Sequence, residues 1–240
     1  MNEDEPTPPG EPYFDPTKVP NPTVWEQKRR LADAMRRVIS HMVLSDAPEQ
    51  ELSDASDALE RFGERLAVHP KLERVMGHAE AANAGNVAAF FDQSPLIGLA
   101  NPLAPPVTIS RSGPLTATAT VTFGSAYEGP PGHVHGGFVA AAFDEVLGYV
   151  QSLGGHPGMT GRLTIHYRRP TPLHTPLRFE AQLVREQGRK IFTEAQLYDG
   201  TTLTAEAEGL FVSIPRQRLE KLADEAPNSR AQIATSREDL

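Results

Sequence analysis

Two glycines and one carboxylate are the residues of this chain whose types and spacing point to chemistry. Gly136 and Gly137 open the segment GGFVAAAFDEVLG, and Asp144 follows eight residues after Gly136. The first amides of a helix lack intrahelical acceptors and carry the positive end of the helix dipole. Such an amide can bind a carbonyl and stabilise its developing oxyanion, while a carboxylate can take a proton from water. The pattern predicts attack of water on a carbonyl, although a Gly-Gly pair also fits a plain loop-to-helix turn.

The residues beside Asp144 favour it over the adjacent Glu145 as the functional carboxylate. One flank of the helix that we expect over about 137–152 carries only small residues apart from Asp144, so that a ligand or another backbone can approach closely. Adjacent helical residues point about 100° apart, so Glu145 cannot share this flank. The small residues are Gly137, Ala140, Ala141 and Gly148.

The same spacing predicts the number of subunits in a site. Eight residues of helix separate Gly136 from Asp144 by about 12 Å. An oxyanion donor and a base must both lie within about 3–4 Å of the reacting centre. Two antiparallel copies of the helix, related by a two-fold axis, bring the start of one beside the middle of the other. If both residues are functional, the site is shared between the subunits of a dimer.

The elements around this helix predict an α+β domain. The other face of the helix is broadly apolar, as a sheet would require. Apolar residues alternate with polar ones before and after it, which indicates strands. The order is two strands, the helix and four strands, so we expect one antiparallel sheet that wraps the helix. The alternating segments are 115–123, 163–167, 177–183, 191–197 and 203–207.

The rest of the chain predicts four regions. We expect a Pro-rich leader over 1–22, a helical extension over 23–93, the α+β domain over 94–214 and a polar tail over 215–240. In the extension, apolar stripes at helical spacing predict two helices, with a third, weaker one over about 72–82. Such stripes are packing surfaces, either on the next domain or on a partner. The stripes are Leu31, Met35, Val38 and Met42, then Leu52, Ala55, Leu59, Phe62 and Leu66.

Composition excludes several classes of protein. The 240 residues carry a net charge of −8, which argues against a nucleic-acid partner because phosphates attract a basic face. The chain contains no cysteine, so disulfides, thiolate nucleophiles and zinc–thiolate sites are excluded. No apolar run is long enough to span a membrane, and the acidic start does not resemble a secretory signal. We therefore expect a cytoplasmic protein.

Ordered motifs in this chain resemble the hotdog-fold acyl-CoA thioesterases, in particular the phenylacetate-pathway type and the thioesterase-superfamily members. They are HGG with an aspartate nine residues after the histidine, MTGRLTIHYRRPTPLHTPL with its Tyr-x-x-Pro turn, and EQGRKIFTEAQLYDGTTLTAEAEGLFV. The resemblance covers about 94–214. It implies a hotdog fold, in which an antiparallel sheet wraps a long central helix. It also implies hydrolysis of acyl-CoA to free acid and CoA by a homodimer or a dimer of dimers. No cofactor is implied, since CoA enters as part of the substrate.

The resemblance also implies roles for individual residues. The amide of Gly136 or Gly137 would polarise the thioester carbonyl, and His135 would orient the loop or contact the thioester. Asp144 of the partner would act as general base, or alternatively as nucleophile. Thr160 matches a position where some relatives keep a hydroxyl near the attacking water, although a threonine at a strand edge needs no such role.

A basic turn is the site that the resemblance implies for the nucleotide end of CoA. Gly188, Arg189 and Lys190 would contact its phosphates there. A solvated turn explains the same charges. Some relatives carry an asparagine six residues before the motif histidine, where this chain has Gly129, and compact members lack the N-terminal extension.

Other interpretations remain open beside this one. His133 and His135 with Asp144 lack a third ligand of convincing spacing, so we expect no metal site. His166 is expected at a surface or interface. A Ser-His-Asp hydrolase is disfavoured because the chain has no Gly-x-Ser-x-Gly elbow, and a hotdog dehydratase because it has no Asp-x-Asn-Pro-x-His pattern. The non-enzyme alternative is an acyl-CoA or fatty-acyl binding protein whose helical extension recruits a partner.

Overall fold

The computed structural model describes residues 22–70, 92–155 and 158–213. The expected third helix and the polar tail lie outside the described residues, as does all of the Pro-rich leader except its last residue. No helix among the described residues is long and apolar enough to cross a membrane. In chain order the main elements are α1 (Pro22–Met42), α2 (Glu49–Ala67), β1 (Thr108–Gly113), β2 (Thr116–Val121), α5 (Gly136–Ser152), β3 (Gly158–Tyr167), β4 (Leu177–Gln187), β5 (Lys190–Asp199) and β6 (Thr202–Ser213).

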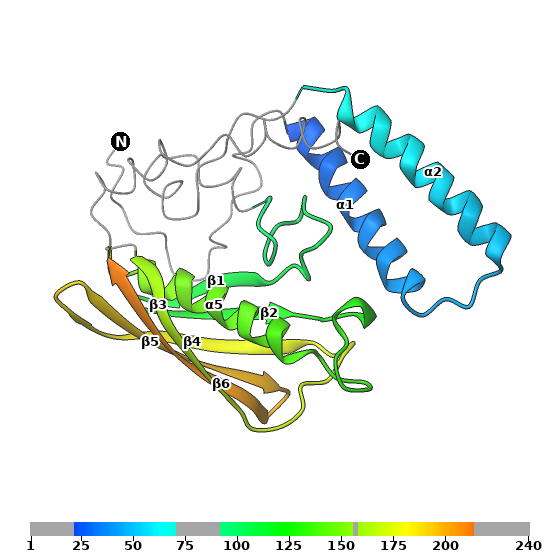
Figure 1. Ribbon diagram of the computed structural model, residues 1–240. Helices are drawn as coiled ribbons and strands as arrows, with labels where there is room; N and C mark the ends of the chain where they lie inside the picture. Colours follow the sequence, from blue (N-terminus) through cyan, green and yellow to red (C-terminus); the bar gives the residue numbers. More distant parts are fainter. Residues whose placement is uncertain (1–21, 71–91, 156–157, 214–240) are drawn as a thin grey trace.

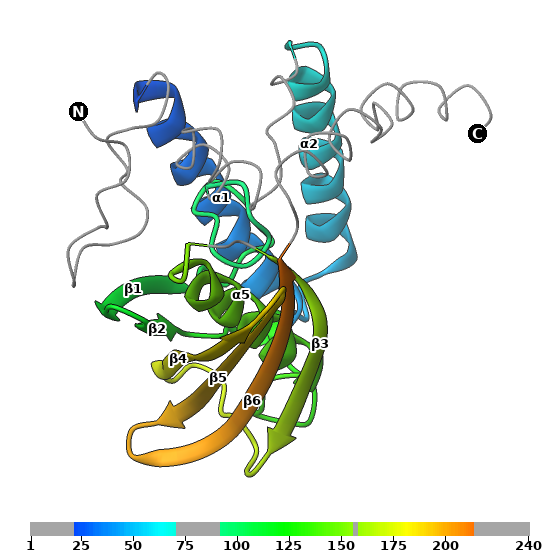
Figure 2. The same cartoon turned by 90° about the vertical axis from the view of Figure 1, so that its left-hand side faces the viewer.

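Six antiparallel strands form one sheet around α5. Their order is β1-β2-β4-β5-β6-β3, so β1 and β3 are the two edges. The sheet curves around one side of α5, while α1 and α2 lie on the side of α5 that faces away from the sheet (Figures 1 and 2). The α+β architecture and the order of two strands, helix and four strands predicted from the sequence are confirmed.

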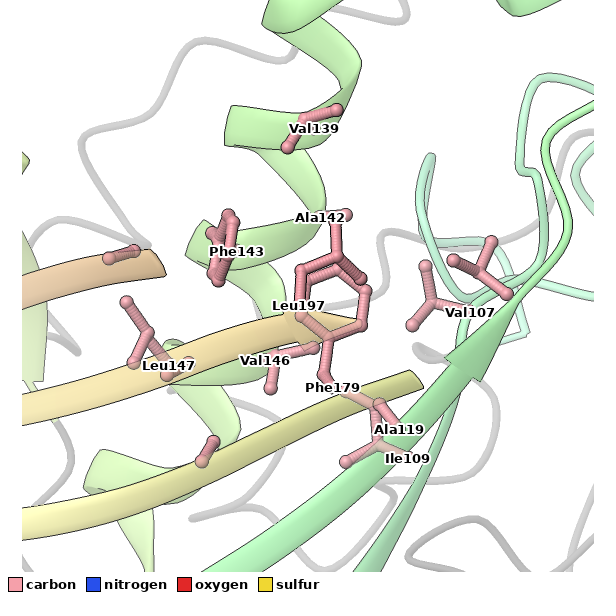
Figure 3. Packing of buried hydrophobic residues seen from close by; sticks show 14 of the residues in the cluster. Val107, Ile109, Ala119, Val139, Ala142, Phe143, Val146, Leu147, Phe179 and Leu197 are labelled. Atoms are coloured by element: carbon pink, nitrogen blue, oxygen red, sulfur yellow. The ribbon is translucent and has the colours of Figure 1, made fainter. Parts of the chain in front are cut away.

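The core lies between the concave face of the sheet and the apolar face of α5. The predicted apolar residues of this helix are all at most 1% exposed. Figure 3 shows Val146 and Leu147 beside the strands that carry Phe179 and Leu197. The ring of Phe143 meets Phe179 of β4 edge-on, with 5.0 Å between ring centroids. Each such side chain stabilises the fold by roughly 1.5–3 kcal/mol through burial. The residues are Val139, Phe143, Val146, Leu147 and Val150.

One strand boundary differs from the prediction. Leu115 was expected to begin an inward-facing series, but it lies in the turn before β2 and is 42% exposed. Its carbonyl accepts a hydrogen bond from the amide of Leu183 of β4 at 2.9 Å. The backbone of Leu115 therefore extends the pairing of β2 with β4, while its side chain is exposed. Ala117, Ala119 and Val121 are buried as predicted.

Helix α1 is attached to the segment before β1 through a mixed face. Trp25 and Ala32 are 5% and 2% exposed, and the Arg29 guanidinium binds the buried carboxylate of Asp92 at 2.9–3.0 Å. Two turns beyond Arg29, Arg36 donates to the carbonyl of Asn101 at 3.0 Å. The predicted apolar stripe of α1 points elsewhere on the helix, because residues 25, 29, 32 and 36 share the docking face. Sequence periodicity thus located the helix, but its apolar stripe does not form this docking face, and packing of the stripe on a partner stays a prediction.

Candidate active site

His135 closes the loop before α5 and caps the helix. Its backbone amide donates to the carbonyl of Tyr127 at 2.9 Å, which ties the loop back on itself. Its ring nitrogen Nδ1 accepts a hydrogen bond from the amide of Gly137 at 3.0 Å. This bond requires an unprotonated Nδ1 and satisfies one of the open amides of the first turn. The Gly137 amide is therefore engaged within the chain.

Gly136 is the residue that keeps an open amide at this helix start. Among the described residues none accepts a hydrogen bond from its N–H, whereas its carbonyl accepts one from the Tyr167 hydroxyl at 2.8 Å. A side chain at this position would meet that hydroxyl, since an added Cβ would lie 3.3 Å from it. The glycine thus lets the end of β3 approach the helix closely and leaves the amide available to a carbonyl oxygen.

Asp144 lies two turns further along α5, on the flank that the sheet leaves uncovered. Its Oδ1 accepts a hydrogen bond from the Thr160 hydroxyl at 2.9 Å. Its side chain is partly exposed, as are the small residues Ala140, Ala141 and Gly148 beside it. A carboxylate held in this way has lone pairs left for water, and Thr160 fixes its orientation.

Strand β3 positions both ends of this arrangement. It runs antiparallel to α5, so Tyr167 at its end reaches Gly136 and Thr160 near its start reaches Asp144. These two hydrogen bonds hold the helix to the edge strand at both proposed functional positions. The hydrogen bond of Thr160 with Asp144 joins two residues that the resemblance had assigned to the same site. Tyr167 was missed as a residue of the site, because its bond to Gly136 spans 31 residues of chain and leaves no local pattern.

Glu145 has a different environment from its neighbour. Burial, with a smaller contribution from the charge of Asp144, raises the pKa of Glu145 from 4.5 to about 7. Its side chain is only partly accessible to solvent. A carboxyl group with a pKa near neutrality is suited to proton transfer, so Glu145 is a second candidate base beside Asp144.

The basic turn lies between β4 and β5. Gly188 has φ +59°, in the left-handed region that glycine adopts readily, and Arg189 donates to the carbonyl of Ser213 at 3.1 Å. All three residues of the turn are exposed. Lys190 pairs with Val212, and Thr160 with Phe211, so the turn lies at the same end of the sheet as the Thr160–Asp144 pair.

The loop before α5 leaves no space for a side chain at Gly129. An added Cβ at Gly129 would lie 2.7 Å from the Cα of His135, which is closer than real contacts allow. This position therefore has no room for an amide side chain in the present loop. Within the loop, the Glu128 carboxylate accepts a hydrogen bond from the Gly132 amide, while the His135 ring caps the helix.

The other histidines stand apart from this arrangement. His133 places Nδ1 2.8 Å from the carbonyl of Pro131, and His166 is exposed on β3 opposite Glu206 of β6. Within the described ranges no three His, Asp or Glu side chains are grouped so that they could hold a metal ion.

Comparisons with known proteins agree with this architecture. The thioesterase superfamily model matches residues 131–206. Acyl-coenzyme A thioesterase THEM4 of Xenopus laevis is 37% identical over 91 residues, and human acyl-coenzyme A thioesterase THEM5 is 29% identical over 106. These matches cover 36% and 43% of this chain, which spans about 40% of the length of each relative.

A solved structure extends the likeness beyond the sheet domain. The crystal structure of a thioesterase superfamily protein is 34% identical, and the match has a TM-score of 0.70. It covers 77% of this chain and 94% of that one, so it includes part of the helical region before residue 92. The sheet wrapped around α5 is a hotdog fold, as expected, and the chain belongs to the thioesterase superfamily.

Proposed function

We propose that this protein hydrolyses acyl-CoA thioesters to the free acid and CoA. The observation that carries the proposal is the Thr160–Asp144 hydrogen bond on the uncovered flank of α5, in a chain whose Gly136 amide is open. Membership of the thioesterase superfamily supports the reaction class, and the relatives named acyl-coenzyme A thioesterase support the substrate class.

The proposed reaction uses each of these groups once. The Gly136 amide donates a hydrogen bond to the thioester oxygen and stabilises the negative charge that develops there. Asp144 takes a proton from a water molecule as its oxygen attacks the carbonyl carbon, and the Thr160 hydroxyl keeps the carboxylate oriented. The tetrahedral intermediate then collapses, the carbon–sulfur bond breaks, and the thiolate leaves. The proton from water ends on the thiol or the solvent, so one water is consumed for each thioester.

The spacing of the groups supports a site shared by two subunits. About 12 Å of helix separates Gly136 from Asp144, too far for both to serve one carbonyl within a single chain. Strand β3 is an edge of the sheet, and its unpaired backbone groups can pair with another chain. A two-fold axis beside β3 would bring the start of one α5 toward the middle of the other. We therefore propose a homodimer, or a dimer of dimers, as the active form.

The basic turn is the proposed contact for the nucleotide end of CoA. Arg189 and Lys190 offer positive charge, and the glycine before them leaves the turn open to phosphate oxygens. Substitution of Lys190 by methionine tests this role. We expect a higher KM for acyl-CoA with little change for a short thioester that lacks the nucleotide.

Hydrolysis of a panel of acyl-CoAs tests the proposal, with Asp144→Asn as the variant and Glu145→Gln as its matched neighbour. We expect Asp144→Asn to lower kcat about 100-fold or more, since a positioned base contributes about 10²–10⁴-fold. The Gln variant should retain most activity. The reverse result would assign the base to Glu145. If the unaltered protein binds acyl-CoA but hydrolyses none, the protein is a binding module instead.

A further inference from the structure

Helix α2 carries an apolar stripe that the described chain does not cover. None of its 19 residues is buried, and the leucines at 52, 59 and 66 are 45%, 52% and 49% exposed. In Figures 1 and 2 the helix lies apart from the sheet. An isolated helix of this length is marginally stable in water, and its stability in proteins comes from packing of its apolar face. We therefore expect another surface to pack against this apolar stripe.

The spacing of the stripe identifies the kind of partner. Its residues follow at alternating intervals of three and four, and the three leucines recur at every seventh position. A repeat of 3.5 residues is the pattern of a helix that packs lengthwise against another helix in a coiled coil. The members of this seam are Leu52, Ala55, Leu59, Phe62 and Leu66.

The charges of α2 favour another α2, in antiparallel orientation. Its first half, residues 49–57, contains four acids and no Lys or Arg, whereas the second half is neutral because Arg61 and Arg65 balance its two glutamates. A parallel pair would set the acidic halves against each other. An antiparallel pair sets each acidic half beside the neutral half of the other helix, where the two arginines lie, so that the acidic halves are kept apart.

Gly63 gives an independent indication that a second helix approaches α2 closely. A glycine within a helix costs roughly 1 kcal/mol relative to alanine. A Cβ added here would have nothing within 4 Å, so the described chain itself gives no reason for the glycine. The residue lies beside the seam, next to Phe62, where a missing side chain lets a second helix come near.

We propose that α2 pairs with α2 of a second copy of this chain, antiparallel and through the seam. Such a helix pair buries less surface than a stable interface of about 1,000 Å² needs on its own, so it adds to another contact between copies. The pair is separate from the proposed catalytic groups on α5, and its failure would leave the proposed hydrolysis intact.

Disulfide trapping tests the pairing directly, because the natural sequence contains no cysteine. Leu59→Cys sets a thiol at the middle of the seam, and Glu64→Cys sets one on the opposite face of the same helix as the matched control. Mild oxidation of the full chain, followed by non-reducing electrophoresis, reports covalent dimers of doubled mass. We expect conversion of Leu59→Cys to dimer with little dimer from Glu64→Cys.

The orientation is tested with cysteines near the two ends of the seam. An antiparallel pair brings Leu52→Cys of one copy near Leu66→Cys of another, so a mixture of the two variants should cross-link and each variant alone should not. Equal cross-linking of Leu59→Cys and Glu64→Cys would overturn the pairing. Self-cross-linking of Leu52→Cys and of Leu66→Cys would overturn the antiparallel orientation.

Discussion

Helices α5 and α2 are of similar length and both carry apolar stripes, yet the described residues cover only α5. Eight residues of α5 are buried by the sheet, whereas α2 has none. The uncovered flank of α5 carries small residues and Asp144, which leaves room for a ligand. The uncovered face of α2 carries leucines, which bind no small polar group. The side chains on an uncovered helix flank therefore indicate what binds there. The flank of α5 is suited to a substrate, and the face of α2 is suited to a second helix.

The largest difference between the two helices should appear when the same residue type is truncated in each. Phe143→Ala removes a ring that is fully buried against Phe179, and we expect a loss of about 3–5 kcal/mol in the free energy of unfolding. Phe62→Ala in α2 should cost less than about 1 kcal/mol, since surface substitutions have small effects. Urea unfolding at low protein concentration measures both. Equal losses would show that α2 belongs to the same cooperative core as α5.

Removal of a hydroxyl group should lower kcat beside α5 but leave it unchanged on α2. Thr160→Val deletes the donor to Asp144, and hydrogen bonds to charged groups contribute about 1.5–3 kcal/mol, so kcat should fall about tenfold or more. Thr160→Ser keeps the hydroxyl and should restore most of the rate. Ser56→Ala in α2 removes a hydroxyl that bonds only its own helix at Leu52, and kcat should not change. An unchanged kcat in Thr160→Val would mean that the threonine is merely a strand-edge residue.

The smallest effect concerns the pH dependence of stability. The pKa of Glu145 rises from 4.5 to about 7 on folding, so the folded state holds its proton more tightly than the unfolded chain. The resulting stability is complete below about pH 4.5 and is lost as pH rises through about 7. Relative to Glu145→Gln, the natural protein should lose on the order of 1 kcal/mol between pH 5 and 8, after a discount for partial exposure.

Thermal unfolding of both proteins over this pH range measures the loss, with Glu64→Gln on exposed α2 as the control. A constant difference between the natural protein and Glu145→Gln at all pH values would contradict a buried carboxyl at position 145.

Local patterns predicted the apolar face of α5 and the strand series, because both depend on periodicity that a neighbouring surface must match. They did not reveal the docking face of α1, since Arg29 and Arg36 dock by polar contacts that no apolar stripe indicates. They did not identify Tyr167 as the residue that binds Gly136, because that contact depends on how β3 runs beside α5. The engagement of the Gly137 amide by His135 depends on loop geometry, which spacing alone leaves open.

The central claim, a site shared between subunits, is tested most directly by complementation between two inactive variants. Asp144→Asn removes the proposed base. Gly136→Pro removes the proposed amide donor at a first helical position where proline is tolerated. His135 before it has ψ 130°, which suits a residue preceding proline. Gly136→Ala keeps the amide and controls for crowding against Tyr167.

The two variants are co-expressed with different tags and the mixed dimers are assayed on acyl-CoA. If each site takes its amide from one subunit and its carboxylate from the other, a mixed dimer has one intact and one doubly defective site. A purified mixed dimer should then have about half of the natural rate, and an unfractionated random mixture of the dimers about a quarter. Activity no higher than that of the separate variants would contradict a shared site.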